Sequence, residues 1–168
     1  MHRLYQYVGP EHIRAACHDS PSGVVIRSTD DLLAWLGARA DEAMPDGSII
    51  ATFVIDSGGL LRLAPRQSEH VACASGGPVF SAGEITFDAD GEVFTITNQS
   101  TGFCPEPESW PAVEAALGRI GIVHPGRFTE AIIFRLCPRC KERSIVKDEW
   151  YVCEMCGSTL PTRWNFPI

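Results

Sequence analysis

Four cysteines in the last third of the 168-residue chain have the spacing of a metal site. Cys137 and Cys140 form one C-x2-C pair, and Cys153 and Cys156 form a second pair twelve residues later. Each pair bends the backbone into a tight turn, a knuckle, that places two thiolates on one metal ion. Four cysteine ligands leave no coordination position for water or substrate, so we expect a structural Zn²⁺. An iron site with the same ligands is the alternative.

Two short strands are predicted between the knuckles, at residues 144–147 and 150–152, where β-branched and aromatic side chains gather. The order knuckle, strand, turn, strand, knuckle is the zinc-ribbon pattern, and residues 137–160 resemble the zinc-ribbon group. Members of that group serve as docking modules for proteins or nucleic acids, so the resemblance implies an architecture and a role in binding. So short a segment buries little apolar area, and bound metal would supply most of its folding free energy.

Five polar residues upstream are candidates for catalysis, because they flank glycine-rich turns where polar groups can converge on a pocket. They are His70, Glu84, Asn98, Ser100 and Cys104. A histidine beside a glutamate can act as a general base, and a cysteine beside a histidine can act as a nucleophile. The structural alternative is that Glu84 and Asn98 fix strand ends. Ser100 would then cap a turn, and Cys104 would pack in the core.

This region also resembles a domain shared by plant calmodulin-binding IQ-motif proteins and assorted bacterial proteins. The resemblance covers residues 70–110 and rests on two segments, HVACASGGPVFSAGE at residues 70–84 and NQSTGFCP at residues 98–105. The family has a His-Ser start and a Ser-Gly-His-Tyr-x-Pro loop. Here Val71 follows the histidine, and Phe-Cys replaces His-Tyr. The resemblance therefore implies no catalytic His-Tyr pair, and the sequence has no IQ helix.

The other cysteines, Cys17, Cys73 and Cys104, have no paired neighbour, so we expect free thiols. The chain starts without the basic and apolar stretches of a signal peptide and has no run of about 18 apolar residues. We therefore expect a soluble cytoplasmic protein without membrane contact.

Charge divides the chain into an acidic part and a mildly basic part. Residues 1–134 hold 8 of the 14 Lys and Arg and 17 of the 21 Asp and Glu, a net charge of −9. Residues 135–168 carry six positive and four negative side chains. Because an acidic surface repels phosphate backbones, nucleic acid is not the expected partner, and any contact with it would have to come from residues 135–168 alone. We expect a protein partner, and a basic one would suit the acidic part.

Three helices are predicted to position these sites. They are residues 11–16, 29–39 and 111–120. Ser28 or Thr29 can cap the second helix, whose first turn is acidic, and Gly121 provides a stop for the third. Both longer segments place apolar residues at helical spacing, so each should pack one face on a core.

Strands are predicted mainly as neighbouring hairpins. They are residues 3–8, 24–26, 48–55, 60–63, 84–87, 93–97 and 128–136. The turn sequences DSGG at residues 56–59 and ADG at residues 89–91 favour two hairpins. Because no regular βαβ rhythm occurs, the sequence predicts an α+β fold, a mixed or antiparallel sheet with about three helices and a C-terminal zinc ribbon.

We divide the chain into an α+β body, residues 1–134, and residues 135–168, the zinc ribbon with a docked C-terminal tail. The first function hypothesis is a zinc-binding protein-interaction or regulatory module in which zinc is structural. The alternative is an enzyme that acts on a nucleotide-like or other small polar substrate in a pocket near His70 and Glu84. The residue pattern leaves both hypotheses open.

Overall fold

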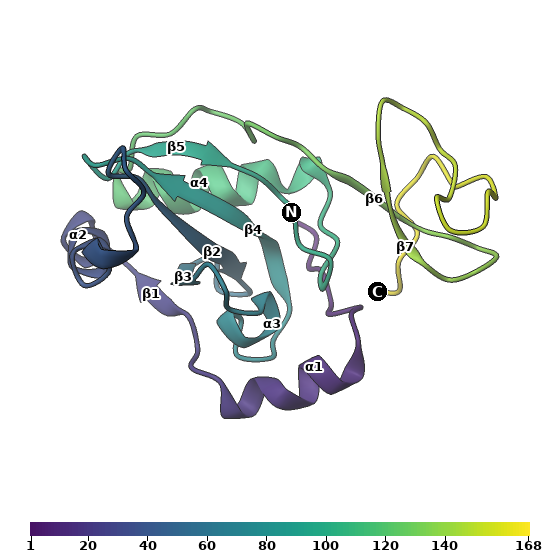
Figure 1. Ribbon diagram of the computed structural model, residues 1–168, viewed down its shortest axis with the longest axis horizontal. Helices are drawn as coiled ribbons and strands as arrows, with labels where there is room; N and C mark the ends of the chain where they lie inside the picture. The colour runs from purple at the N-terminus through teal and green to yellow at the C-terminus, as the bar shows by residue number, and fades with distance from the viewer.

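The molecule has the predicted α+β fold, with a five-stranded antiparallel sheet and a separate two-stranded sheet (Figure 1). The structure is a computed structural model and describes residues 1–168. The α-helices are α1 (Glu11–Ala16), α2 (Thr29–Gly37), α3 (His70–Cys73) and α4 (Trp110–Ile120). The strands are β1 (Val24–Ile26), β2 (Ile49–Asp56), β3 (Leu61–Pro65), β4 (Val79–Phe87), β5 (Val93–Ile96), β6 (Ile133–Leu136) and β7 (Arg143–Val146). Short 3₁₀ helices are η1 (Cys17–Asp19), η2 (Ala40–Glu42) and η3 (Pro107–Ser109).

The five-stranded sheet has the order β1-β3-β2-β4-β5, and every neighbouring pair is antiparallel. Its central strand, β2, is covered on both faces. Phe53 and Ile55 pack with residues of α2 and α4 on one face, whereas Val54 packs with α3 on the other. Because both faces are buried, the β2 sequence is an almost continuous apolar run.

Local sequence signals set the ends of the two longer helices close to the predicted positions. Ser28 Oγ accepts a hydrogen bond of 3.1 Å from the Asp31 N–H and caps α2. Gly121 adopts a φ of 84°, and its N–H bonds to the Leu117 carbonyl, which ends α4. Positive φ costs glycine little, so this residue suits the stop.

The predicted strand at residues 3–8 is wrong. Only Tyr5 forms a bridge, exchanging backbone hydrogen bonds of 2.7 and 3.1 Å with Val79. The segment alternates like a strand because Tyr5 enters the core while Leu4 and Gln6 remain exposed. One buried side chain between two exposed ones thus gives the alternating pattern, although no strand longer than a single bridge forms.

The predicted strand at residues 128–136 is shorter in the structure. The N–H groups of Thr129 and Glu130 donate to the Ile96 carbonyl, at 2.9 and 3.4 Å. This stretch therefore covers the outer edge of β5, and a regular strand begins only at Ile133. That strand, β6, pairs with β7 and not with the five-stranded sheet.

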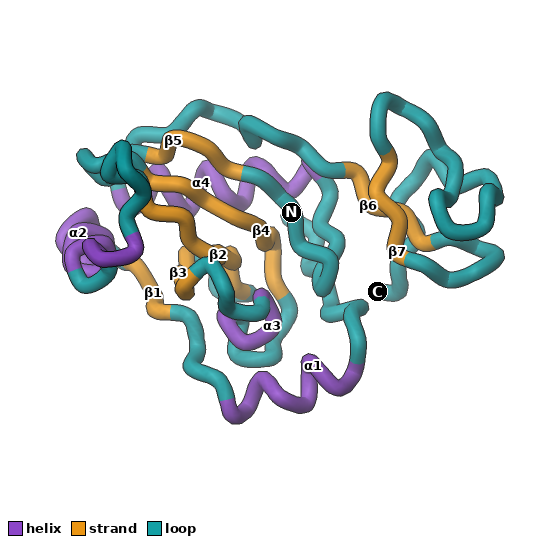
Figure 2. Tube along the Cα trace, viewed as in Figure 1, coloured by secondary structure: helices purple, strands orange, loops and turns teal.

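The ribbon segment, residues 133–160, lies at one end of the molecule beside the five-stranded sheet (Figures 1 and 2). Outside β6 and β7 it consists of loops and turns, as Figure 2 shows. The predicted strand at residues 150–152 is wrong, because only single bridges occur there, from Trp150 to Lys147 and from Val152 to Thr159. No helix of the molecule has the length and apolar character needed to cross a membrane.

Candidate metal centre and polar cavity

The two cysteine pairs have the same backbone geometry. The N–H of Cys137 donates to the carbonyl five residues later, and its own carbonyl accepts from the N–H four residues later, at 2.8 and 3.0 Å. The corresponding bonds of Cys153 are both 2.8 Å. The fourth residue after each of these cysteines adopts positive φ, 63° at Lys141 and 71° at Gly157. The repeated turn is a knuckle, and it directs both thiols of a pair to the same side.

The four cysteines come together into one group whose sulfur atoms all lie within 4.8 Å of one another. Cys137 Sγ is 3.6 Å from Cys156 Sγ, and Cys140 Sγ is 3.6 Å from Cys153 Sγ. A disulfide would need about 2.05 Å, so these thiols are free. A tetrahedron with metal–sulfur bonds of about 2.3 Å has edges of about 3.8 Å. The spacing and the soft donor set therefore fit a four-coordinate metal ion.

Hydroxyl groups lie next to two of the sulfur atoms. Ser144 Oγ donates to Cys153 Sγ at 3.5 Å, and Ser158 Oγ lies 3.3 Å from Cys156 Sγ. Such neighbours orient metal ligands and offset the negative charge of thiolates.

Three basic residues of the ribbon contact groups other than the four sulfur atoms. Lys141 donates to the Pro138 carbonyl at 2.9 Å, and Lys147 lies 3.6 Å from the Glu154 carboxylate. Arg143 donates to the Thr101 carbonyl of the five-stranded unit. Arg143 therefore contributes a contact between the ribbon and the rest of the chain.

The ribbon has a very small apolar core. The cluster around the cysteines has the buried members Cys137, Val146, Cys153 and Leu160. Phe134 of β6 is buried outside this cluster, against Cys104 and Phe166. Two large apolar side chains instead face solvent, since Trp150 is 70% and Met155 is 72% exposed. A four-residue core that includes two of the proposed ligands cannot hold this segment folded without a further constraint.

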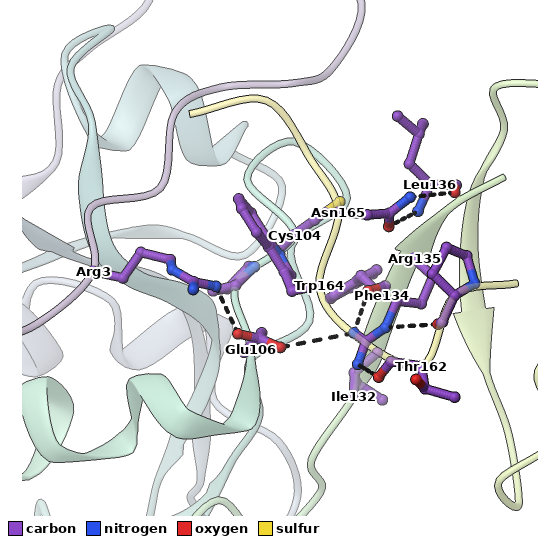
Figure 3. A network of polar contacts seen from close by, with 12 residues as sticks. Arg3, Cys104, Glu106, Ile132, Phe134, Arg135, Leu136, Thr162, Trp164 and Asn165 are labelled. Carbon is purple, nitrogen blue, oxygen red and sulfur yellow. Dashed lines mark hydrogen bonds and ion pairs between the residues drawn. The ribbon is translucent and has the colours of Figure 1, made fainter. Parts of the chain in front are cut away.

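Residues after the ribbon fold back onto β6 (Figure 3). The Asn165 side chain donates to the Leu136 carbonyl at 2.7 Å and accepts from the Leu136 N–H at 2.9 Å. Arg135, only 5% exposed, donates to the carbonyls of Pro161 and Thr162 at 3.2 and 2.8 Å. The Asn165 side-chain amide thus pairs with the N–H and carbonyl of Leu136 at the edge of β6 where no neighbouring strand does so.

Trp164 joins the same segment to the five-stranded unit. Its indole N–H donates to the Cys104 carbonyl at 2.9 Å. The Tyr5 ring meets it edge to face at 5.6 Å, and the Arg3 guanidinium lies 4.7 Å above it. Arg3 is held in turn by the Glu106 carboxylate at 2.8 Å (Figure 3). Trp164 therefore joins the C-terminal segment to the N-terminal segment and to the loop that contains Cys104.

Of the five catalytic candidates, the structure brings His70 and Glu84 together around one cavity of about 470 Å³. His70 begins α3, a helix that the sequence analysis missed, and Glu84 projects from β4. Residues that line the cavity but were not predicted include Arg66, Gln67 and Gln99. The residues that line the cavity come together because β3, β2 and β4 are neighbours in the sheet. No local sequence signal predicts this strand order.

Asn98, Ser100 and Cys104 do not line this cavity. The Asn98 amide donates to the carbonyls of Pro105 and Ile132 and accepts from the Ile132 N–H, so it joins β5 to the segment before β6. Ser100 Oγ is buried and has no hydrogen-bond partner. Burial raises the pKa of the Cys104 thiol to about 12, which suppresses the thiolate that a nucleophile needs.

No protein-family model, no curated protein and no solved structure matches this chain. The resemblance of residues 70–110 to the domain of the IQ-motif proteins thus has no support from a family match.

Proposed function

We propose that this chain is a protein-interaction or regulatory module whose ribbon is folded around a structural Zn²⁺. The supporting observation is the group of four free thiols with tetrahedral spacing in a segment that has almost no core of its own. All four donors are protein side chains, which is the composition of structural rather than catalytic zinc sites. The metal's role is therefore to fix the ribbon, and the ribbon's role is to present a surface.

Zinc is preferred to iron because paired C-x2-C knuckles are the common ligand pattern of structural zinc sites. Elemental analysis of protein purified without added metal tests this assignment. We expect one zinc and no iron per chain, and tetrahedral thiolate coordination of Co²⁺ substituted at the same site. A metal-free protein that is fully folded would overturn the proposal.

The partner is proposed to be a protein that contacts the ribbon through Trp150 and Met155. Tryptophan and methionine are enriched in protein interfaces, and tryptophan often dominates their binding energy. The acidic residues 1–134 favour a basic partner, because complementary charge accelerates encounter. The free thiols favour a reducing compartment such as the cytoplasm.

The matched pair Trp150→Ser and Phe94→Ser tests the ribbon surface, since Phe94 is also 63% exposed but lies on β5. Once a partner has been isolated by crosslinking, its dissociation constant is measured for both variants. We expect Trp150→Ser to weaken binding at least about tenfold, or about 1.4 kcal/mol, and Phe94→Ser to leave it unchanged. Equal affinities for both variants would place the interface elsewhere.

The second candidate function, an enzyme with a small polar substrate, is favoured by the cavity that His70 and Glu84 share. Apart from the His70 imidazole, no aromatic or aliphatic side chain lines this cavity, so a nucleobase would find little apolar surface to pack on. Of the two substrate classes considered, a small polar molecule therefore suits it better than a nucleotide. Turnover of a candidate substrate, lost in His70→Gln, would be the test.

A further inference from the structure

The cavity beside α3 is unusual because it is lined only by polar side chains. Ligand pockets in proteins are mostly apolar, with a few polar groups that set orientation. The cavity has a volume of about 470 Å³. Its lining comes from the segment after β3, from α3, from β4 and from residues 99–101. This volume suits a small molecule, and the lining selects a hydrophilic one.

The His70 ring offers the cavity a fixed hydrogen-bond acceptor. Its Nε2 lies 2.9 Å from the Gly83 carbonyl oxygen. Because a carbonyl only accepts, Nε2 must carry the proton, and the neutral ring then has its lone pair on Nδ1. Nδ1 has no partner in the protein, yet it is not sealed from solvent. Burial lowers the pKa of His70, which keeps the ring neutral and Nδ1 an acceptor.

The charged groups around the cavity also leave acceptors unused. Arg66 directs its Nε at Glu84 Oε2, at 3.2 Å, so the one cation of the lining is already paired. Glu84 retains its second oxygen, and the Glu69 carboxylate makes no hydrogen bond to the protein. Besides uncharged amide and hydroxyl groups, the lining thus offers two carboxylates and an imidazole nitrogen as acceptors. Its guanidinium already uses the Nε–H in the pair with Glu84.

We propose that this cavity binds a small hydrophilic molecule through a primary ammonium group. The ammonium would donate to Glu84, Glu69 and His70 Nδ1, which gives one acceptor to each of its three donors. Charge-assisted bonds of this kind are the stronger class of hydrogen bond. The inference rests on the cavity of the second proposed function, but it concerns binding alone and requires no catalysis.

Other ligand classes fit the cavity less well. Phosphate or a dicarboxylate would face two carboxylates and only one arginine, which is already paired with Glu84. A divalent metal ion would need several ligand atoms within a few ångströms of one another, and the only such group in the molecule is that of the four cysteines.

Three molecules of equal length but different end groups test the proposal, namely 1,4-diaminobutane, 1,4-butanediol and succinate. Each is titrated into the full metal-loaded chain, and amide shifts are followed by NMR. We expect saturable shifts with the diamine only, centred on residues 66–70, 84 and 99–101. Equal or tighter binding of the diol or of succinate, or no binding of the diamine, would overturn the ammonium assignment.

Matched variants separate a site from diffuse attraction of cations to an acidic protein. His70→Ala removes the Nδ1 acceptor, while Glu84→Gln removes one charge at the cavity. Glu92→Gln removes the same charge from the exposed β4–β5 turn. We expect the first two to weaken diamine binding at least about tenfold and Glu92→Gln to leave it unchanged.

Equal weakening by Glu84→Gln and Glu92→Gln would refute a defined site. Absence of catalysis at this cavity would contradict the second proposed function but would not change these binding results. The two proposals can therefore be refuted separately.

Discussion

Asp56 shows how one side chain closes the turn between β2 and β3. Its Oδ1 accepts from the N–H groups of Gly58 and Leu60, at 2.9 and 3.0 Å, and its Oδ2 accepts from Arg62 Nε at 2.7 Å. Burial alone would raise the pKa of this carboxyl group. The hydrogen bonds from Leu60, Arg62 and Gly58 outweigh burial and hold its pKa below the usual range.

We expect Asp56→Asn to lower the free energy of unfolding by about 1–3 kcal/mol at pH 7, because charged acceptors form the stronger hydrogen bonds. A depressed folded-state pKa stabilises the protein above the unfolded pKa of about 3.9, and the effect is lost as pH falls through the folded value. Urea unfolding of both proteins should thus give a constant difference from pH 8 to 5 that shrinks below about pH 4. A difference unchanged at pH 3 would contradict this explanation. Acid also releases the metal, but it does so from both proteins, so this effect cancels in the difference between their free energies of unfolding.

Gly83 lies where the chain after β5 crosses close to β4. A Cβ atom at this position would be 1.9 Å from the Thr97 carbonyl oxygen, which is backbone and cannot rotate away. We expect Gly83→Ala to destabilise the protein by at least about 2–3 kcal/mol. The control is Gly118→Ala in α4, where a Cβ meets nothing within 4 Å. That change should stabilise the protein by about 0.5–1 kcal/mol in thermal unfolding. Similar effects of both changes would argue against the close approach.

At the scale of elements, prediction succeeded where the determining residues are neighbours in the sequence. Ser28 and Asp31 form the α2 cap within one turn of helix, and the cysteine knuckles need only residues 137–142 and 153–158. Prediction failed where a distant segment decides the structure. Tyr5 has a partner 74 residues away, in β4, so alternation alone could not show that the pairing stops after one residue.

The candidate sites show the same contrast between features set by neighbouring residues and features set by distant segments. The metal ligands were predictable because the spacing of a C-x2-C pair directly determines which sulfur atoms can meet. His70 and Glu84 were named for their chemistry, but their shared cavity also needs Arg66, which reaches Glu84 only across β2. The polar character of the cavity therefore follows from strand order and not from any motif.

The segment after the ribbon, residues 161–168, packs as an element although it has no regular secondary structure. We expect its deletion to lower the melting temperature by at least about 5 °C. The change would remove Trp164 and Phe166 from buried contacts and leave the Arg135 guanidinium buried without two of its three carbonyl acceptors, those of Pro161 and Thr162. Deletion of residues 167–168 alone, which are exposed, should have little effect. Unchanged melting of the longer deletion in a calorimeter would show that these contacts contribute no stability.

At the scale of the whole molecule, the apolar residues form separate clusters. The two large clusters surround the five-stranded sheet, and neither includes a residue of the ribbon. The ribbon cluster contains two of the four cysteines, and a small cluster of Cys104, Phe134 and Phe166 joins β6 to the rest of the chain. Loss of the metal should therefore disorder the ribbon while the sheet stays folded.

We expect a chelator, or Cys140→Ser, to collapse the NMR signals of residues 133–160 and to preserve those of β1 to β5. The melting temperature should also fall, since residues 161–166 pack between the ribbon and the sheet. Readdition of Zn²⁺ after chelation should restore the ribbon signals of the wild-type protein, whereas added Zn²⁺ should not restore them in Cys140→Ser. Unfolding of all seven strands in one step would contradict the separation of the cores.

The contact between Tyr5 and Trp164 has a consequence for how the molecule is made. Ribosomes add about 5–20 residues per second, so roughly 10–30 seconds pass between the synthesis of these two residues. During that interval Tyr5 lacks its cover, and Cys104 and Phe134 join the uncovered apolar surface as each of them is added. A nascent chain is then most exposed to aggregation, and most in need of a chaperone, just before Trp164 leaves the ribosome.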